Sequence, residues 1–227
     1  MDTKNKHIAH VIFDVDGTLV DTLQPGYRVD CSLIKQLGGR SPNLHEYRRQ
    51  LGTGSWDQFY AAFGVSDTKS ATALYYEQMA DAQAQLIPGA REIVALARGK
   101  PVISVHSIDI ETNTPSVVSL NSSKEVVLKR LAKSGLDSFF NPKQVLAVPD
   151  SKTGAVIATC SLLGYEPQDV LYVGDTAKDV REAKAAGVLT AAVAHPDFGY
   201  NDRDMVQVEN PDFLFDDIRD LTDLLRA

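Results

Sequence analysis

Asp14 and Asp16 stand one residue apart directly after a short apolar run, where carboxylates can hold a metal ion or move protons. The run His-Val-Ile-Phe at residues 10–13 is typical of a strand buried on both faces, so the two acids lie where the chain leaves that strand. Gly17 allows a turn and a close approach to a ligand, and the hydroxyl of Thr18 can tie the turn. Crowded carboxylates favour a neutralising cation, and hard oxygen ligands favour Mg²⁺. The alternative is an ordinary Asp-Gly turn with solvated acids.

Asp175 and Asp179 repeat this arrangement later in the chain. They follow the apolar run Val-Leu-Tyr-Val at residues 170–173, with Gly174 before the first acid. A loop and a first helical turn would bring both side chains toward the same pole of the molecule. Acidic residues at the start of a helix are also ordinary caps, so both interpretations stay open for this pair alone. The likeness to Asp14 and Asp16 favours the functional one.

The runs before these acids belong to a series of short apolar segments, each typical of a buried strand. Further segments of this kind occupy residues 102–105, 116–120, 145–148 and 189–194, and residues 213–215 are a candidate edge strand. Strands that alternate with helical patterns predict an α/β fold. In open α/β sheets the chemistry takes place at the carboxyl ends of the strands, which is where the aspartates fall.

Residues 22–87 differ from the rest because they carry helical spacing and no convincing strand. We expect helices at residues 25–37, 43–51, 55–63 and 67–86. An all-helical block inserted after the first strand of an α/β chain indicates a separate cap. The predicted division is a core domain of residues 1–21 and 88–227 and a helical cap domain of residues 22–87.

The stretch DVDGTLVD at residues 14–21 resembles the first motif of the haloacid dehalogenase-like (HAD) hydrolase superfamily, in the branch of phosphoglycolate phosphatase and β-phosphoglucomutase. Gly174-Asp175 followed by Asp179 resembles its fourth motif. The resemblance implies a doubly wound parallel sheet, a Rossmann-like HAD core, with an inserted α-helical cap that closes over the site. It also implies that Asp14 is the nucleophile that forms an aspartyl-phosphate and that Asp16 is the general acid and base.

The same resemblance implies the binding of Mg²⁺ and of the phosphoryl group. Mg²⁺ would be held by Asp14, the Asp16 carbonyl and Asp175, with Asp179 as a ligand or as a partner through water. A Ser or Thr at a strand end binds the phosphoryl group in the family, and our choice is Ser119, because the helical pattern after it matches. The alternatives are Ser104 and Ser107, which the length of the preceding helix favours. The expected substrate-binding neighbours are Gly17, Thr18, Leu120 and Asn121.

Lys152 is the candidate for the cation that holds the nucleophile and the phosphoryl oxygens together. Many relatives have Lys-Pro at this point, whereas this chain has Lys152-Thr153. A lysine at a helix N-terminus opposes the helix dipole, so its presence is better explained if it turns toward an acidic or phosphate-bearing site. Lys143 is the alternative. The residues of the cap that could contact a leaving group, none of them singled out, are Arg28, Arg48, Arg49, Trp56 and Tyr60.

Composition excludes several other classes of function. The formal net charge of -7 and the lack of a Lys/Arg stripe argue against nucleic-acid binding. No apolar run of about 18 residues occurs, so we expect no membrane span. The sequence has only two cysteines, Cys31 and Cys160, and its first residues lack an apolar signal region. We therefore expect a cytoplasmic protein. The resemblance to the HAD superfamily implies a small phosphorylated metabolite as its partner, and a monomer or a homodimer is expected.

The resemblance implies a Mg²⁺-dependent phosphatase that hydrolyses a small phosphomonoester through an aspartyl-phosphate, as the phosphoglycolate phosphatases do. The alternatives within enzymes are a β-phosphoglucomutase-like transfer to a sugar and a pyrophosphatase or nucleotidase activity. Dehalogenases and phosphonatases of the family lack an acid at the position of Asp16, so both are disfavoured. The non-enzymatic alternative is a catalytically silent HAD-fold binding protein.

Overall fold

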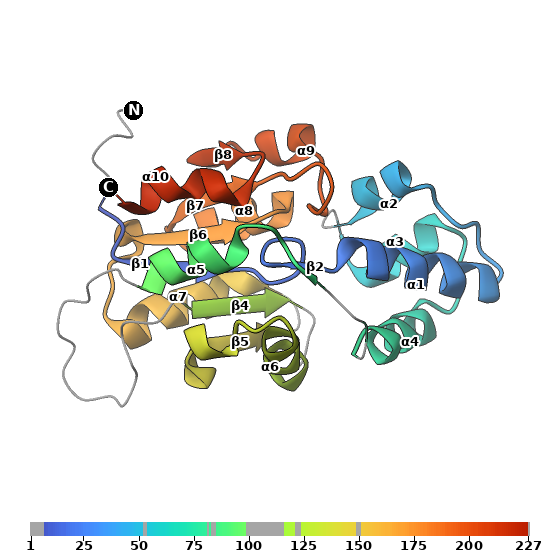
Figure 1. The fold of residues 1–227 in the computed structure, drawn as a ribbon. Coiled ribbons are helices and arrows are strands. Elements are labelled where there is room, and N and C mark those ends of the chain that lie inside the picture. The colour runs from blue at the N-terminus through green and yellow to red at the C-terminus, as the bar shows by residue number, and fades with distance from the viewer. Residues whose placement is uncertain are drawn as a thin grey trace.

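The structure is a computed structural model that describes residues 7–51, 54–80, 82, 85–98, 116–120, 124–148 and 151–226. Its described part contains a six-stranded, all-parallel sheet with the strand order β5-β4-β1-β6-β7-β8 (Figure 1). The strands are β1 (His10–Phe13), β4 (Ser116–Leu120), β5 (Val145–Val148), β6 (Val170–Gly174), β7 (Leu189–Val193) and β8 (Phe213–Phe215). From the central β1 the chain builds β4 and β5 on one side and then β6 to β8 on the other. The predicted doubly wound α/β fold is therefore confirmed.

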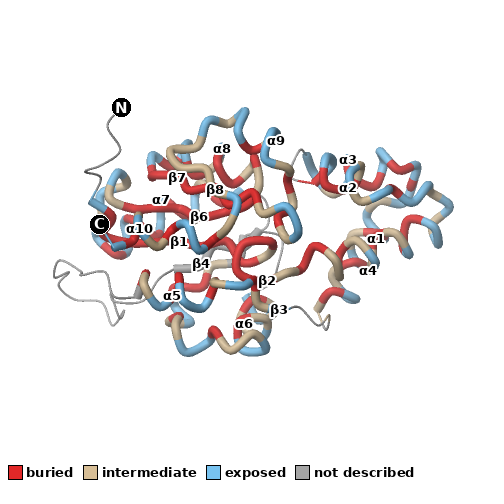
Figure 2. The backbone as a smooth tube through the Cα atoms, turned by 45° about the horizontal axis from the view of Figure 1, so that its top comes forward, coloured by how far each residue is buried: buried red, intermediate tan, exposed pale blue. Residues whose placement is uncertain are grey.

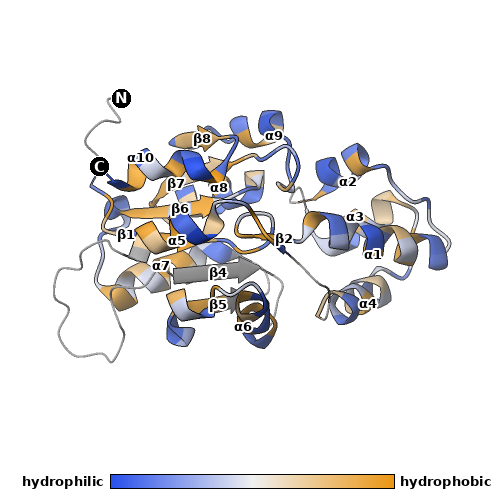
Figure 3. Cartoon of the chain, in the orientation of Figure 1, coloured by the Kyte–Doolittle hydropathy of each residue, from blue (hydrophilic) through white to orange (hydrophobic). Residues whose placement is uncertain are grey.

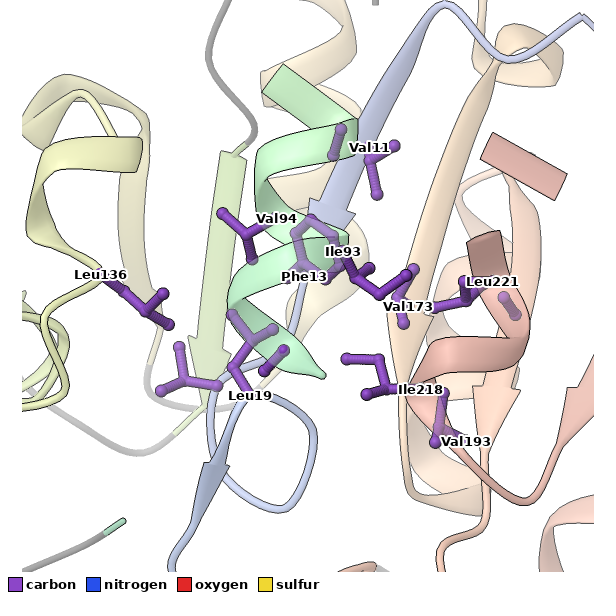
Figure 4. Close-up of a cluster of buried hydrophobic side chains, with 14 of the residues drawn as sticks. Val11, Phe13, Leu19, Ile93, Val94, Leu136, Val173, Val193, Ile218 and Leu221 are labelled. Carbon is purple, nitrogen blue, oxygen red and sulfur yellow. The ribbon is translucent and has the colours of Figure 1, made fainter. Parts of the chain in front are cut away.

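Successive residues of the strands face opposite layers of helices, which is why the strands are largely apolar. Phe13 packs in one buried cluster together with residues of α5 (Ala90–Arg98), α6 (Lys124–Lys133) and α10 (Leu221–Arg226) (Figure 4). Ile12 packs in another cluster with residues of α7 (Lys152–Leu163) and α8 (Ala177–Ala185). In Figure 3 the strand β6 is orange, whereas the helices mix orange and blue residues, as expected for helices with one buried face.

The register of the sheet brings the two acidic motifs, which begin at Asp14 and at Asp175, to one edge. Phe13 of β1 pairs with Val173 of β6, so the residues that follow them, Asp14 and Gly174-Asp175, leave the sheet side by side. On the other side of β1, Phe13 pairs with Val117, which places Ser119 of β4 toward the same edge. This is the carboxyl end of the strands beside the point where the winding direction reverses, where ligands of open α/β sheets bind.

A block of helices stands beside that edge (Figure 1). It consists of α1 (Leu23–Gln36), α2 (Leu44–Gln50), α3 (Trp56–Ala62) and α4 (Thr68–Ala80). Asn43 and Ser55 form capping boxes that begin α2 and α3. The block has a hydrophobic cluster of its own, seen as the buried red segments of α1 to α4 in Figure 2. The division at residues 22 and 87 stays a prediction, which this separate cluster supports.

Two expectations about the elements were wrong or incomplete. The helix expected at 67–86 ends at Ala80, and Gln85–Leu86 forms a short strand, β3, antiparallel to β2 (Val20–Asp21). These two segments connect the sheet domain to the helical block, so they run side by side and pair with each other. The helix α9 (Arg203–Gln207) was not anticipated. The expected strand at 102–105 lies outside the described residues.

Among the described helices, none has both the length and the apolar character needed to cross a membrane. Cys160 is buried, Cys31 is partly exposed, and both are free thiols. The expected cytoplasmic location stays a prediction.

Candidate active site

Asp14 is the first residue after β1, and its side chain is buried at the edge of the sheet. Its N–H donates to the carbonyl of Val173, which continues the pairing of β1 with β6. The Nζ of Lys152 lies 2.8 Å from Oδ2 of Asp14. Burial, opposed by Lys152 and reinforced by Asp179, raises the pKa of Asp14 to about 7. The carboxylate is thus held at one oxygen by an ammonium group.

Lys152 is the first residue of α7 and lies between two carboxylates. Its Nζ is 2.8 Å from Asp14 and 2.5 Å from Oδ1 of Asp179, and the side chain is only 5% exposed. Burial alone would lower the pKa of Lys152, but Asp14 and Asp179 outweigh it and raise the pKa well above its ordinary value. Lys152 is therefore a charged link between the acids. Lys143, the alternative candidate, is exposed in a short 3-10 turn (Pro142–Gln144).

Asp175, the first residue after β6, is completely buried. Thr18 donates its hydroxyl to Oδ1 at 3.0 Å, and the backbone N–H of Tyr200 donates to Oδ2 at 2.6 Å. Burial and the charges of Asp179 and Asp14 raise the pKa of Asp175 well above its ordinary value. Gly17 has φ 77°, and a Cβ there would lie 2.4 Å from Asp175 Oδ2, so only glycine fits this approach.

Asp179 is at the third position of α8, where its side chain completes a capping box with Thr176. It accepts hydrogen bonds from Lys152 Nζ at 2.5 Å and from the hydroxyl of Tyr172 at 3.1 Å. Burial would raise the pKa of Asp179, but Lys152 and the hydrogen bonds of Thr176 hold it below its ordinary value. Asp179 is therefore an ionised acid, although it is also a helix cap.

Three of the four predicted metal ligands come together in space. Asp14, Asp175 and Asp179 each offer a carboxylate oxygen, and these oxygens lie within 4.8 Å of one another. Among the described residues, the three buried carboxylates have one ammonium group beside them, that of Lys152, which contacts Asp14 and Asp179, so the cluster is short of positive charge. Clustered oxygen ligands with excess negative charge fit a divalent cation. The carboxylate of Asp16 is not part of this cluster, which leaves its carbonyl as the group that could join it.

Asp16 instead forms an ion pair that sequence reasoning missed. The Nη1 of Arg130, in α6, lies 2.5 Å from Oδ1 and 2.6 Å from Oδ2 of Asp16. The Asp16 carboxylate raises the pKa of Arg130 against the opposing effect of burial. Arg130 lies more than 100 residues from Asp16 in the sequence, on a helix with other charged residues. No local signal distinguished it from an ordinary exposed arginine.

These groups open into a cavity of about 390 Å³ between the sheet domain and the helical block. The sheet domain contributes Asp14, Asp16, Lys152, Asp179 and Arg130 to its wall, among others. The helical block contributes mostly apolar and aromatic side chains, including Trp56, Phe59, Tyr75, Tyr76 and Met79. A cavity that joins a charged floor to an apolar roof suits a small ligand with one highly charged end.

The candidates in the cap have different places. Trp56 lines the cavity, whereas Arg28 is exposed on α1 and Tyr60 donates to the buried Asp30 at 2.6 Å. Arg48 and Arg49 turn away from the cavity toward the segment that follows β7, where they pair with Asp202 and Asp204. Of these five residues, only Trp56 is placed to contact a ligand in the cavity.

The remaining predicted residues have these positions. Ser119 and Leu120 are the last two residues of β4, paired with Ala147 and Val148. Asn121, Ser104 and Ser107 lie outside the described residues, so the choice of Ser119 stays a prediction. Gly17 and Thr18 support Asp175 and are not among the residues that line the cavity.

Comparisons of sequence and of fold with known proteins identify the family of this chain. The family model of haloacid dehalogenase-like hydrolases matches residues 11–193. Phosphoglycolate phosphatase 1 of Pseudomonas aeruginosa is 29% identical over 222 residues, which cover 93% of this chain and 77% of the relative. The N-acetylmuramic acid 6-phosphate phosphatase of that species is 27% identical over 237 residues, covering 98% and 96%. A HAD family hydrolase from Deinococcus radiodurans, solved with bound phosphate and sodium, has a TM-score of 0.72 at 16% identity, covering 97% and 96%. The chain belongs to the haloacid dehalogenase-like hydrolase family.

Proposed function

We propose that this protein is a Mg²⁺-dependent phosphatase that hydrolyses a small phosphomonoester through an aspartyl-phosphate on Asp14. The observation that carries the proposal is the buried Asp14 carboxylate, which Lys152 holds at 2.8 Å at the floor of the cavity. One of its oxygens, Oδ1, makes no hydrogen bond to a described residue. An oriented carboxylate with a free oxygen beside a charged ammonium group is suited to attack phosphorus.

In the proposed reaction Asp14 attacks phosphorus in line with the ester oxygen, and the P–O bond to the leaving group breaks. Asp16 gives a proton to the departing oxygen and then takes one from the water that attacks the aspartyl-phosphate. Lys152 and the end of β4, where we place Ser119, Leu120 and Asn121, bind the phosphoryl oxygens. A divalent cation held by Asp14, Asp175, Asp179 and the Asp16 carbonyl would supply positive charge beside those oxygens.

Substrate size is limited by the cavity. Its volume of about 390 Å³ is near the lower end of ordinary ligand sites, which run from about 300 to 1,000 Å³. The two curated relatives described above are phosphatases with substrates of unlike size, so their names support the reaction more than one substrate. We therefore propose a small phosphorylated metabolite, acted on by a cytoplasmic enzyme, monomeric or homodimeric, with residues 22–87 as its cap.

The proposal is tested with the purified full chain, MgCl₂ and a panel of phosphoglycolate, p-nitrophenyl phosphate, β-glucose 1-phosphate, a nucleoside monophosphate and pyrophosphate. We expect release of inorganic phosphate from the small monoesters, lost with a chelator and in Asp14→Asn. The control Asp197→Asn, at an exposed position, keeps its activity. Isomerised sugar phosphate without free phosphate would identify a mutase instead. No turnover of any member of the panel would overturn the proposal in favour of a binding protein.

A further inference from the structure

Arg130 places a guanidinium group in the wall of the cavity, beside Asp16. Its side chain is 11% exposed, and Nη1 contacts both oxygens of Asp16. The other guanidinium donors, Nε and Nη2, make no hydrogen bond to a described residue. A guanidinium group has a planar set of donors that matches a carboxylate, so Arg130 has binding capacity left over beside Asp16.

The other positive side chains of the described cavity wall lie beside acids other than Asp16. Lys152 lies between Asp14 and Asp179, two of the three clustered carboxylates that could hold a cation. Lys178 lies 3.7 Å from Glu182, one turn further along its own helix. Among the positive side chains of the described wall, Arg130 is thus the one that pairs with Asp16.

The helical block brings no charge to this wall within the described residues. Its contributions are Gln50, Leu51, Gly54, Ser55, Trp56, Phe59, Tyr75, Tyr76, Met79 and Ala80. Any negative charge on the leaving group of a substrate therefore finds its counter-charge on the sheet domain. Charge at Arg130 and an apolar roof together favour a leaving group with one anionic end and little bulk.

The position of that anionic end follows from the role of Asp16. In the proposed function Asp16 contacts the ester oxygen, so a cation bound to Asp16 lies on the side of the leaving group. A carboxylate that reaches Arg130 from this oxygen must be separated from it by few bonds. Phosphate esters of 2-hydroxy carboxylic acids, with one carbon between the ester oxygen and the carboxylate, meet this requirement.

We propose that Arg130 is a specificity-determining residue that binds a substrate carboxylate adjacent to the phosphate ester. Arg130 binds the substrate carboxylate with its remaining donors, Nε and Nη2, while Nη1 keeps its contact with the Asp16 carboxyl group beside the ester oxygen. The placement of the substrate carboxylate on the side of the leaving group rests on the proposed function. The substrate class it selects is the phosphate esters of small 2-hydroxy carboxylic acids.

The experiment measures binding without turnover. Calorimetry with MgCl₂ compares 3-phosphonopropionate, in which CH₂ replaces the ester oxygen of phosphoglycolate, with propylphosphonate, which lacks the carboxylate. We expect the wild-type protein to bind the carboxylate compound roughly 10- to 100-fold more tightly, the range of one charge-assisted pair. Arg130→Gln should lose this preference, and Arg130→Lys should keep part of it. The control Lys129→Gln removes a charge from an exposed position of the same helix and should keep all of it.

Equal affinities in the wild-type protein, binding of neither phosphonate, or an unchanged preference in Arg130→Gln would each overturn the assignment. Thermal unfolding of the two Arg130 variants shows whether they are folded. If Arg130→Gln does not fold, Arg130→Lys still tests the carboxylate preference. Turnover of p-nitrophenyl phosphate is measured separately. Turnover with equal affinities would contradict the role of Arg130 alone, whereas a carboxylate preference without any turnover would contradict the proposed phosphatase.

Discussion

Asp175 is a buried carboxylate without a cationic partner among the described residues. It is held by Thr18 and by the backbone N–H of Tyr200, beside the charges of Asp14 and Asp179. Like charges in a buried site destabilise the folded state unless a cation neutralises them. A divalent cation bound as proposed would therefore offset the energetic cost of this arrangement.

Asp175→Asn should raise the melting temperature of the metal-free protein and remove its response to Mg²⁺. In the wild-type protein, binding of Mg²⁺ to the folded state should add about 3 kcal/mol of stability when its concentration is about 100 times Kd. Thermal unfolding at neutral pH with a chelator and with MgCl₂ measures both effects. Asp197→Asn should behave as the wild-type protein does. A variant that is still stabilised by Mg²⁺ would show that Asp175 is not a ligand.

At the scale of residues, the sequence allowed prediction of those groups that lie in contiguous motifs. Asp14 and Asp175 directly follow buried strands, and Asp16 lies two residues after Asp14, so their type and their place could be inferred together. Arg130 could not be identified in this way, because its partner Asp16 belongs to a distant segment and its own helix is an ordinary amphipathic one. Lys152 lay between these cases, since its unfavourable place at a helix start was a local signal.

Three helices of the helical block meet at one buried acid, Asp30 of α1. Asp30 accepts hydrogen bonds from the hydroxyls of Tyr47 of α2, at 2.8 Å, and Tyr60 of α3, at 2.6 Å. Burial, only partly offset by these two donors, raises the pKa of Asp30 from 3.8 to about 7. The charge of Asp30 thus opposes the packing of these helices at neutral pH.

The pH dependence of stability should report this group. Below pH 7 the folded protein binds a proton at Asp30 while the unfolded chain does not, until the pH reaches about 4. Relative to Asp30→Asn, the wild-type protein should therefore gain on the order of 4 kcal/mol of stability as the pH falls from 7 to 4. Urea unfolding of both proteins across this range provides the measurement. If the free energies of unfolding of the two proteins changed with pH in parallel, the raised pKa of Asp30 would be contradicted.

At the scale of elements, apolar runs and helical spacing were reliable guides. The strands β1, β4, β5, β6, β7 and β8 were expected within a residue of their observed bounds, because each is a short and largely apolar run. The helices expected at residues 43–51 and 55–63 begin after Asn43 and Ser55, which cap α2 and α3 in the structure. The pairing of β2 with β3 could not be foreseen, because residues 20–21 and 85–86 acquire their strand geometry only when the helical block folds back to the sheet.

The helical block and the sheet domain are joined at Arg48, a side chain of α2 that is only 10% exposed. It reaches the segment that follows β7, where its partners are the carbonyls of His195, Pro196 and Asn201 and the carboxylate of Asp202. Asn201 completes the contact by donating to the carbonyls of Arg48 and Leu51. The same segment supplies the N–H of Tyr200 to Asp175, so the junction is continuous with the active site.

Neighbouring arginines on α2 allow a matched test of this junction. Arg48→Met leaves several acceptors, most of them only partly buried, without this donor and should lower the free energy of unfolding by about 1–3 kcal/mol. Arg49 pairs with Asp204 at the surface, so Arg49→Met should change it by less than about 0.5 kcal/mol. Urea unfolding of the three proteins measures the difference. Equal effects of the two substitutions would show that Arg48 does not hold the two parts together.

The arrangement of the whole molecule was predictable only in outline. The all-helical spacing of residues 22–87 indicated an insertion, and the acidic motifs indicated which edge of the sheet it would cover. The contacts that set its orientation, such as those of Arg48, join residues more than 140 positions apart and have no counterpart in local sequence patterns. The cavity wall, and with it substrate choice, depends on that orientation.

The identity of the phosphoryl acceptor is tested most directly in Asp16→Asn. Nitrophenolate leaves without a proton donor, whereas attack of water on the aspartyl-phosphate needs the base, so the intermediate should accumulate. Acid quenching of this variant with p-nitrophenyl phosphate and MgCl₂, followed by mass spectrometry of its peptides, should find one phosphoryl group on Asp14 and one equivalent of nitrophenolate released per chain. A phosphoryl group on another residue, or steady turnover without any phosphorylated peptide, would contradict Asp14 as the nucleophile.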